Sequence, residues 1–362
     1  MKVAWSELKY QPKKFLLIEL LIVLMIFMVI FLTGLTNGLG RAVSAQIENY
    51  GDVSYILSDD SEGVLNFSNL KEKDVTALKD MHLENAAGFA IQRSGIQLPG
   101  KSDTKDMTYF AIEEHKLLKP KLSSGKALSK SAKDIILDSS FKDMGVKLGD
   151  QITDKASKEK LTVVAFTSNA QYGHSPVGFI SQETYSKMRR VNTPNYKWTP
   201  QAMMTKDQIK QGDLKADVKL YGQKEIIEKI PGYMAEHTTL TMITWVLLVA
   251  SSAILGVFFY ILTLQKLKQF GVLKAIGMSM GQISRIQLSQ ISLLAIFGVM
   301  TGLILASVLA RFLPAAMPFY LRAENVLTVS LSFVVISIIC GALSLLKIRK
   351  VDPVEVIGGN GE

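Results

Sequence analysis

The sequence predicts a membrane protein with four transmembrane α-helices and a large α+β extracytoplasmic domain between the first and the second helix. Four stretches carry no charged residue over a length that can cross a bilayer, which takes about 20 residues. The long interval between the first two stretches is polar and contains short strand-like and helix-like patterns, which indicate a folded domain. The four stretches are Leu20–Gly40, Leu240–Leu264, Ile286–Ala310 and Val326–Leu346.

The composition supports this division. Of the 362 residues, 48% are hydrophobic and 20% are charged, and the formal net charge is +9. Residues 41 to 236 carry 28 Lys and Arg against 26 Asp and Glu, so most of the excess positive charge lies beside the apolar stretches. This placement is typical of membrane orientation. No basic stripe with interleaved aromatic residues occurs, so we expect no nucleic-acid partner.

Lysine and arginine residues near the spans predict the orientation. They gather before the first span, between the second and third, and after the fourth, which all fall on one side of a four-span chain. Because positive charge is retained inside, that side is the cytoplasm, and both termini are expected there. The residues are Lys2, Lys9, Lys13, Lys14, Lys266, Lys268, Lys274, Arg285, Lys347, Arg349 and Lys350.

The chain therefore divides into nine predicted segments. The first span has a basic start but is longer than the apolar region of a signal peptide, so we expect it to be retained. The segments are a cytoplasmic amphipathic start at 1–14, transmembrane helix 1 at 15–40, the extracytoplasmic domain at 41–237, transmembrane helix 2 at 238–264, a cytoplasmic coupling segment at 265–284, transmembrane helix 3 at 285–312, an extracytoplasmic loop at 313–325, transmembrane helix 4 at 326–346 and a cytoplasmic tail at 347–362.

The extracytoplasmic domain shows a mixed order of elements, which predicts an α+β fold. Strands are expected at Val53–Leu57, Phe89–Leu98, Met107–Ile112, Leu161–Phe166 and Val177–Ile180. Helices are expected at Leu70–Met81 and Gln182–Arg190, and a last helix at Gln223–Glu236 is expected to lead into the second span.

A search for catalytic motifs gives no support for an enzyme. The sequence contains no phosphate-binding G-x-x-x-x-G-K-[ST] motif, no H-E-x-x-H and no G-x-S-x-G. The four histidines are scattered, and the one cysteine, Cys340, lies in an apolar run, so no metal-binding cluster is expected.

The segment between the second and third spans is amphipathic. Leu267, Phe270, Leu273 and Ile276 fall at helical spacing, and Gly277 is placed to end the helix. A short helix of this kind can lie on membrane lipid or dock into a groove of a soluble partner. The pattern alone leaves both interpretations open.

Three segments carry a family resemblance. Phe270-Gly-Val-Leu-Lys-Ala-Ile-Gly277 resembles the signature of the FtsX/MacB superfamily of ABC permeases, a pattern close to E-F-G-I-L-R-A-I-G. The tail Arg349-Lys-Val-Asp-Pro-Val-Glu-Val-Ile357 and the basic opening Leu8-Lys-Tyr-Gln-Pro-Lys-Lys-Phe15 are similar to that superfamily too. Gln269 stands where a glutamate is usual, a departure that is expected to alter contacts to the ATPase.

The resemblance implies a homodimer in the bacterial cell membrane, working with two copies of a separate ATPase that binds the ATP. It also implies mechanotransmission, in which movement of the ATPases tilts the helices and moves the extracytoplasmic domains. The residues expected to couple to the ATPase are Phe270, Gly271, Val272, Leu273, Lys274, Ala275, Ile276 and Gly277.

Within the superfamily the chain resembles the haem-exporting (HrtB) group, in length and in Asn169-Ala-Gln-Tyr-Gly-His-Ser-Pro-Val-Gly178. Haem is then the expected substrate, with no intrinsic cofactor. Ferric iron accepts Tyr, His or Met ligands. Tyr172 and Tyr233 are the first candidates, His174 is held in reserve, and Glu48 is a carboxylate that could meet haem at a dimer interface.

Plainer interpretations of these residues stay open. Tyr233 can belong to the interfacial aromatic belt, Tyr172 can serve packing, and His174 can be a surface histidine. Two other functions also stay open: export of an antimicrobial peptide, drug or lipid-like compound, and regulation of an extracellular hydrolase by a mechanotransmitting protein that has no cargo.

Overall fold

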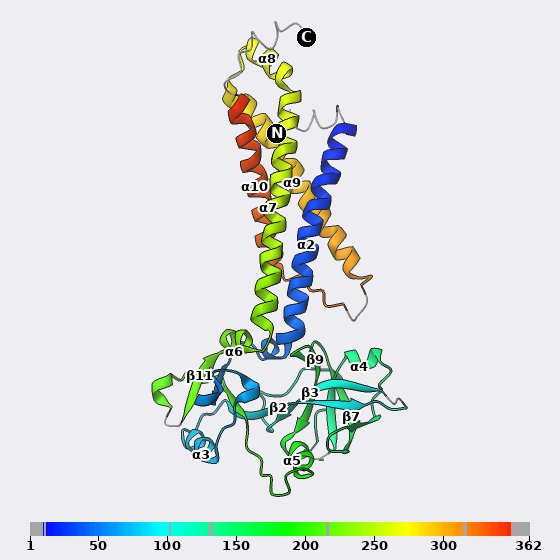
Figure 1. The fold of residues 1–362 in the computed structure, drawn as a ribbon, viewed down its shortest axis with the longest axis vertical. Coiled ribbons are helices and arrows are strands. Elements are labelled where there is room, and N and C mark those ends of the chain that lie inside the picture. The colour runs from blue at the N-terminus through cyan, green and yellow to red at the C-terminus, as the bar shows by residue number, and fades with distance from the viewer. Residues whose placement is uncertain are drawn as a thin grey trace. The chain divides into compact units, whose positions relative to one another are not determined.

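The computed structural model describes residue 10 and residues 12–100, 103–129, 133–214, 217–313 and 317–348 (Figure 1). The amphipathic start at 1–9, Lys130 and the tail from Arg349 lie outside the described residues. The chain forms two units. The helical unit consists of Met1–Gly38 with Thr238–Glu362, and the sheet unit consists of Leu39–His237.

Four helices of the described chain are long and apolar enough to cross a membrane, which confirms the four predicted spans. Each helix is longer than its uncharged stretch, since polar residues extend the helix beyond the apolar part. The helices are α2 at Pro12–Asn49, α7 at Tyr233–Gln265, α9 at Met280–Ala310 and α10 at Ala323–Ile348. A shorter helix, α8 at Leu267–Ala275, lies between α7 and α9 in the chain.

Small residues let these helices approach closely within one chain. A Cβ atom built on Gly302 would lie 2.8 Å from Cγ2 of Ile26, and one on Gly298 would overlap the Ile22 side chain. Gly34 and Gly38 lie against Phe319 and Pro318 in the same manner, and the Tyr320 N–H donates to Gly34 O at 2.9 Å. The small-xxx-small patterns at 34–38 and 298–302 therefore serve packing inside the helical unit.

The sheet unit is built on an 11-stranded mixed sheet, which confirms the α+β prediction. The main strand order is β11-β1-β10-β2-β3-β9-β5-β7-β4, and only the β3–β9 and β5–β7 pairs are parallel among the described strands. The strands are β1 Ser54–Ser58, β2 Ala86–Gln97, β3 Thr104–Ile112, β4 Leu122–Gly125, β5 Asp134–Asp138, β6 Gln151–Asp154, β7 Lys160–Thr167, β8 Gln171–Tyr172, β9 Ser175–Ser181, β10 Ala202–Thr205 and β11 Val218–Gly222.

Both faces of this sheet are apolar. Along β2 and β3, alternate residues enter two different cores, because side chains of a strand point to opposite faces. Phe89 and Phe110 belong to one core, while Ala90 and Tyr109 belong to the other. The helices of this unit are α3 Glu72–Asp80, α4 Ser140–Asp143, α5 Gln182–Arg190 and α6 Gln223–Lys229, with short 3-10 turns at Asp59–Ser61, Leu65–Phe67 and Gln211–Asp213.

The predicted single helix at Gln223–Glu236 is wrong. Helix α6 ends at Lys229, and α7 begins only at Tyr233. Pro231 and Gly232 separate them, and Gly232 has a φ of 87°. Proline lacks the N–H that a continuing helix needs, so the chain turns here before the long helix starts.

Candidate functional site

A tight hairpin positions His174 in the sheet unit. Strands β8 and β9 are joined by Gly173 and His174, both at positive φ (57° and 61°), as a two-residue type I′ connection requires. The N–H groups of Gly173 and His174 donate to the carbonyls of Val43 and Ala42, at 3.0 and 3.1 Å. The hairpin is thereby fastened to the last turns of α2.

His174 meets a carboxylate from the first turn of α7. Its Nε2 lies 3.0 Å from Oε1 of Glu236, and the two side chains are 43% and 39% exposed. The second carboxylate oxygen, Oε2, is buried and has no hydrogen-bond partner among the described residues.

The same turn of α7 carries two stacked rings. Tyr233 and His237 lie one helical turn apart, with ring centroids 5.4 Å apart and planes inclined by 15°. Gly40 of α2 lies beside them, since a Cβ built there would be 3.7 Å from Tyr233 Cε2 and 3.9 Å from His237 Cδ2. We call His174, Tyr233, Glu236, His237 and Gly40 the His174 cluster.

Tyr172 does not belong to the His174 cluster. Its side chain is 3% exposed, packs edge-on to Phe110 and donates from its hydroxyl to Asn66 Oδ1 at 3.1 Å. Burial raises the pKa of Tyr172 above its ordinary value, so the phenol stays neutral. Direct ligation of iron by Tyr172 stays a prediction, and it would require breaking this hydrogen bond and exposing the ring.

Glu48 lies elsewhere on α2. Ser44 donates to its Oε1 at 2.6 Å, and Ser44 itself is fully buried. Glu48 and Gly40 share one helix face, but eight residues of helix separate them by about 12 Å. Among the four candidates, the structure joins His174 to Glu236 in the turn of α7 that carries Tyr233, places Tyr172 in the core against which Tyr233 packs, and leaves Glu48 apart.

Sequence reasoning missed Glu236 and His237. Together with Tyr233 they stand at positions i, i+3 and i+4 at the start of a helix, so they share one face. That spacing is visible in the sequence and could have indicated the cluster. The described residues hold no group of three or more His, Cys, Asp or Glu placed to bind a metal ion.

The coupling segment has two unlike faces in the structure. Phe270 is 9% exposed and packs with Ile283 of α9, with Leu267 and Leu273 beside them. Val272 and Ile276 point outward, with 55% and 72% of their surface exposed. Ile276 therefore does not share the buried stripe that its helical spacing predicts.

Gly277 ends α8 in a C-terminal motif that requires its positive φ of 98°. Its N–H donates to Lys274 O, and the N–H of Met278 donates to Leu273 O, both at 3.0 Å, which is the Schellman pattern. The prediction that Gly277 caps the helix is confirmed. The turn fixes the direction in which α9 starts.

A buried lysine stands just before α8. Lys266 is 5% exposed, and its Nζ donates to Gln290 Oε1 at 2.8 Å and lies 5.4 Å from the centre of the Phe15 ring. It therefore ties the end of α7 to α9 and α2. The sequence showed Lys266 only as one of several basic residues.

Comparison with known proteins identifies the family. Residues 15–219 match the model of the MacB-like periplasmic core domain, and residues 241–353 match that of the FtsX-like permease C-terminal domain. A protein of Staphylococcus haemolyticus named as a hemin transport system permease, HrtB, is 30% identical over 99% of both chains. The chain belongs to the FtsX/MacB superfamily of ABC transporter permeases.

Further similar proteins include two sequence relatives and one solved structure. A Staphylococcus epidermidis protein of the same name is 28% identical over 99% of both chains, and an uncharacterised ABC transporter permease of Mycobacterium tuberculosis is 26% identical over 71% of this chain and 70% of its own. The periplasmic region of MacB from Actinobacillus actinomycetemcomitans aligns with 53% of this permease and 95% of that chain, at 13% identity and a TM-score of 0.37.

Proposed function

We propose that this permease exports haem from the cell membrane, driven by an ATPase on a separate chain. The observation that carries the proposal is the similarity to the Staphylococcus haemolyticus hemin transport permease, which extends over 99% of both chains. A resemblance of that extent includes the membrane helices and the sheet unit alike.

The His174 cluster is the haem-handling site in this proposal. Haem presents an apolar ring, two propionates and an iron that accepts tyrosine or histidine. Tyr233 and His237 offer a pair of stacked aromatic rings for contact with the porphyrin, and Gly40 lies close to both rings. His174 is held in reach by Glu236, and release of that contact frees its Nε2 for iron.

Tyr172 and Glu48 have supporting roles in this proposal. Tyr172 and Asn66 stabilise the strand that leads into the His174 turn. Glu48 stays a candidate for contacts at the interface of a homodimer.

The outward face of α8 is the proposed contact to the ATPase. Val272 and Ile276 are exposed, with Lys268 and Lys274 beside them, whereas Phe270 holds the helix to α9. Two ATPase copies would bind a homodimer on its cytoplasmic side, where both termini lie. Their approach would move α8 and, through Lys266, the membrane helices.

Haem handling by cells tests this function. A strain that lacks this permease and its ATPase is complemented with both wild-type chains, and growth in added haem and cell-associated haem are measured. The proposal expects higher haem tolerance and lower cell-associated haem. Equal tolerance with and without the two chains would refute haem export. Net accumulation of haem in the complemented cells would indicate import in place of export.

Haem-stimulated ATPase activity of the purified complex supplies the second test. The activity is measured in lipid nanodiscs with haem and with the same concentration of free iron. We expect haem alone to stimulate hydrolysis. A response to iron alone would place the specificity on the metal and not on the porphyrin.

A further inference from the structure

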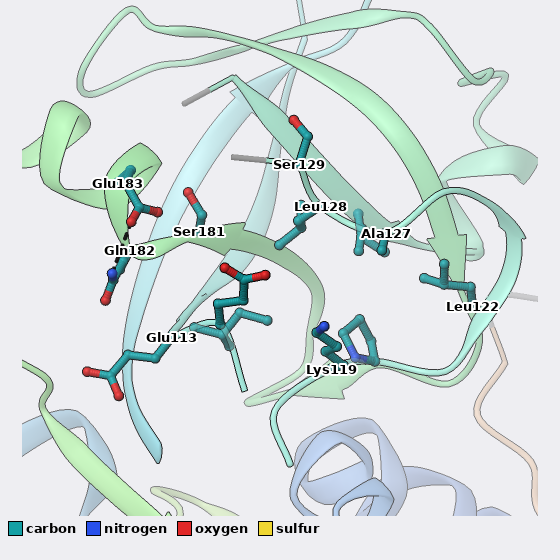
Figure 2. A pocket seen from close by; sticks show the side chains of 13 residues that line it. Glu113, Lys119, Leu122, Ala127, Leu128, Ser129, Ser181, Gln182 and Glu183 are labelled. Atoms are coloured by element: carbon teal, nitrogen blue, oxygen red, sulfur yellow. Dashed lines mark hydrogen bonds between the residues drawn. The ribbon is translucent and has the colours of Figure 1, made fainter. Parts of the chain in front are cut away.

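The sheet unit contains a cavity of about 470 Å³ (Figure 2). None of the described residues that line it belongs to the His174 cluster. Its floor is apolar and is formed by the end of β3, by β5 and by the loop on either side of β4. Figure 2 shows Gln182 and Glu183 on one side of the cavity and Leu122 on the other. The apolar lining comes from Ile112, Pro120, Leu122, Ala127, Leu128 and Ile136.

The charged part of the lining is mainly acidic. Among the described lining residues, Glu114 and Glu183 contribute two carboxylates and Lys119 contributes one ammonium group, whereas the Glu113 carboxylate is turned toward Gly88 and Trp198, which do not line the cavity. Glu113 is fixed in place, because its oxygens accept from the Gly88 N–H at 2.7 Å and from the indole N–H of Trp198 at 3.0 Å. Glu114 and Glu183 are exposed at the cavity.

This chemistry does not suit haem. The described lining includes no histidine, tyrosine, methionine or cysteine that could bind iron. The propionates of haem would also meet the carboxylates of Glu114 and Glu183, and like charges in a partly enclosed site repel.

The cavity suits a cation with an apolar body. Its volume lies in the range of small-molecule sites, which is roughly 300–1,000 Å³. The apolar floor can bury the hydrocarbon part of a ligand, and the acidic side can pair with one positive charge of that ligand. We propose that this cavity binds an apolar amine or a related small organic cation, independently of any haem site.

Dye binding to the full-length permease in lipid nanodiscs tests the proposal. The probe is the cationic dye rhodamine 6G, measured by fluorescence anisotropy with empty nanodiscs as the blank, and the comparison probe is the anionic dye 8-anilinonaphthalene-1-sulfonate. The cation is expected to bind saturably above the blank. Equal or tighter binding of the anion would overturn the proposal.

Two variants locate the binding. Replacing Glu114 and Glu183 by Gln together removes two exposed charges and leaves the core intact, and we expect binding of rhodamine 6G to weaken about tenfold, a change of about 1.4 kcal/mol. The matched control Glu84→Gln removes one exposed carboxylate outside the cavity and should bind as the wild type does.

The second variant, Ala127→Trp, fills the cavity, and loss of the dye signal is expected. Unchanged binding in both variants would show that the dye sits elsewhere and would refute the site. Because the double Gln variant changes only exposed side chains, it decides the question even if Ala127→Trp fails to fold.

Discussion

His174 Nε2 and Glu236 Oε1 lie 3.0 Å apart, although 62 residues separate them in the chain. One comes from a β-hairpin turn and the other from the first turn of a membrane-length helix. The contact joins these two elements inside the sheet unit and sets the orientation of the His174 ring. It also leaves one carboxylate oxygen of Glu236 buried without a partner among the described residues.

Loss of either partner should weaken the response to haem. We expect His174→Ala and Glu236→Gln each to raise the haem concentration for half-maximal ATPase stimulation about tenfold, the equivalent of roughly 1.4 kcal/mol. If the two residues act as one unit, the double variant should be no worse than either single variant. His82→Ala, another histidine of the sheet unit, is the control, and an equal loss there would contradict the assignment.

Tyr172→Phe separates a structural tyrosine from an iron ligand. The variant keeps the ring against Phe110 and loses only the hydrogen bond to Asn66, so we expect it to cost about 1 kcal/mol. For a unit of this size that lowers the melting temperature by about 2–4 °C, which differential scanning calorimetry can measure. The haem absorption spectrum should not change. A lost or shifted spectrum would instead identify Tyr172 as a ligand.

The two faces of α8 should respond differently to substitution. Val272→Asp changes an exposed position and should abolish haem stimulation of the ATPase while leaving the melting temperature of the permease unchanged. Phe270→Ala removes a buried ring from its contact with Ile283 and should destabilise the local fold by about 3 kcal/mol. Retained stimulation in Val272→Asp would mean that the ATPase binds elsewhere.

Gly302 should tolerate no side chain. A Cβ there would lie 2.8 Å from Ile26 Cγ2 and 3.2 Å from the Phe27 backbone N, so Gly302→Ala should destabilise the permease by about 1–3 kcal/mol. Gly256 is the control, because its Cβ would lie 3.5 Å from Cys340, an ordinary contact. Thermal unfolding of both variants in the same detergent makes the comparison, and equal midpoints would contradict the close approach of α2 and α9.

Buried tyrosines should limit the alkaline stability of the sheet unit. Burial raises the pKa of Tyr50, Tyr55 and Tyr172, so the folded state favours the neutral phenol. The unfolded chain ionises at a tyrosine pKa of about 10, so this stabilisation is complete below that pH and is lost as the pH rises toward the folded pKa. Absorbance of tyrosinate should therefore rise together with loss of circular dichroism. Full ionisation before unfolding would contradict the burial.

Much of the fold is predictable because its signals are local. Strands β1, β2, β3, β7 and β9 alternate apolar residues or form apolar runs, and α5 was predicted at its observed bounds, Gln182–Arg190. Strand β11 was not predicted. It is only five residues long and becomes a strand through pairing with β1, which lies far away in the sequence.

The sequence by itself determined four membrane-length helices, a folded domain between the first two, and membership of a permease superfamily. Apolar length and short motifs are properties of neighbouring residues, so they can be read without a structure. Only the tertiary structure decided which candidates share a site. It buried Tyr172 against Phe110, turned Phe270 inward and brought His174 to Glu236, because each contact depends on residues that the chain brings together only on folding.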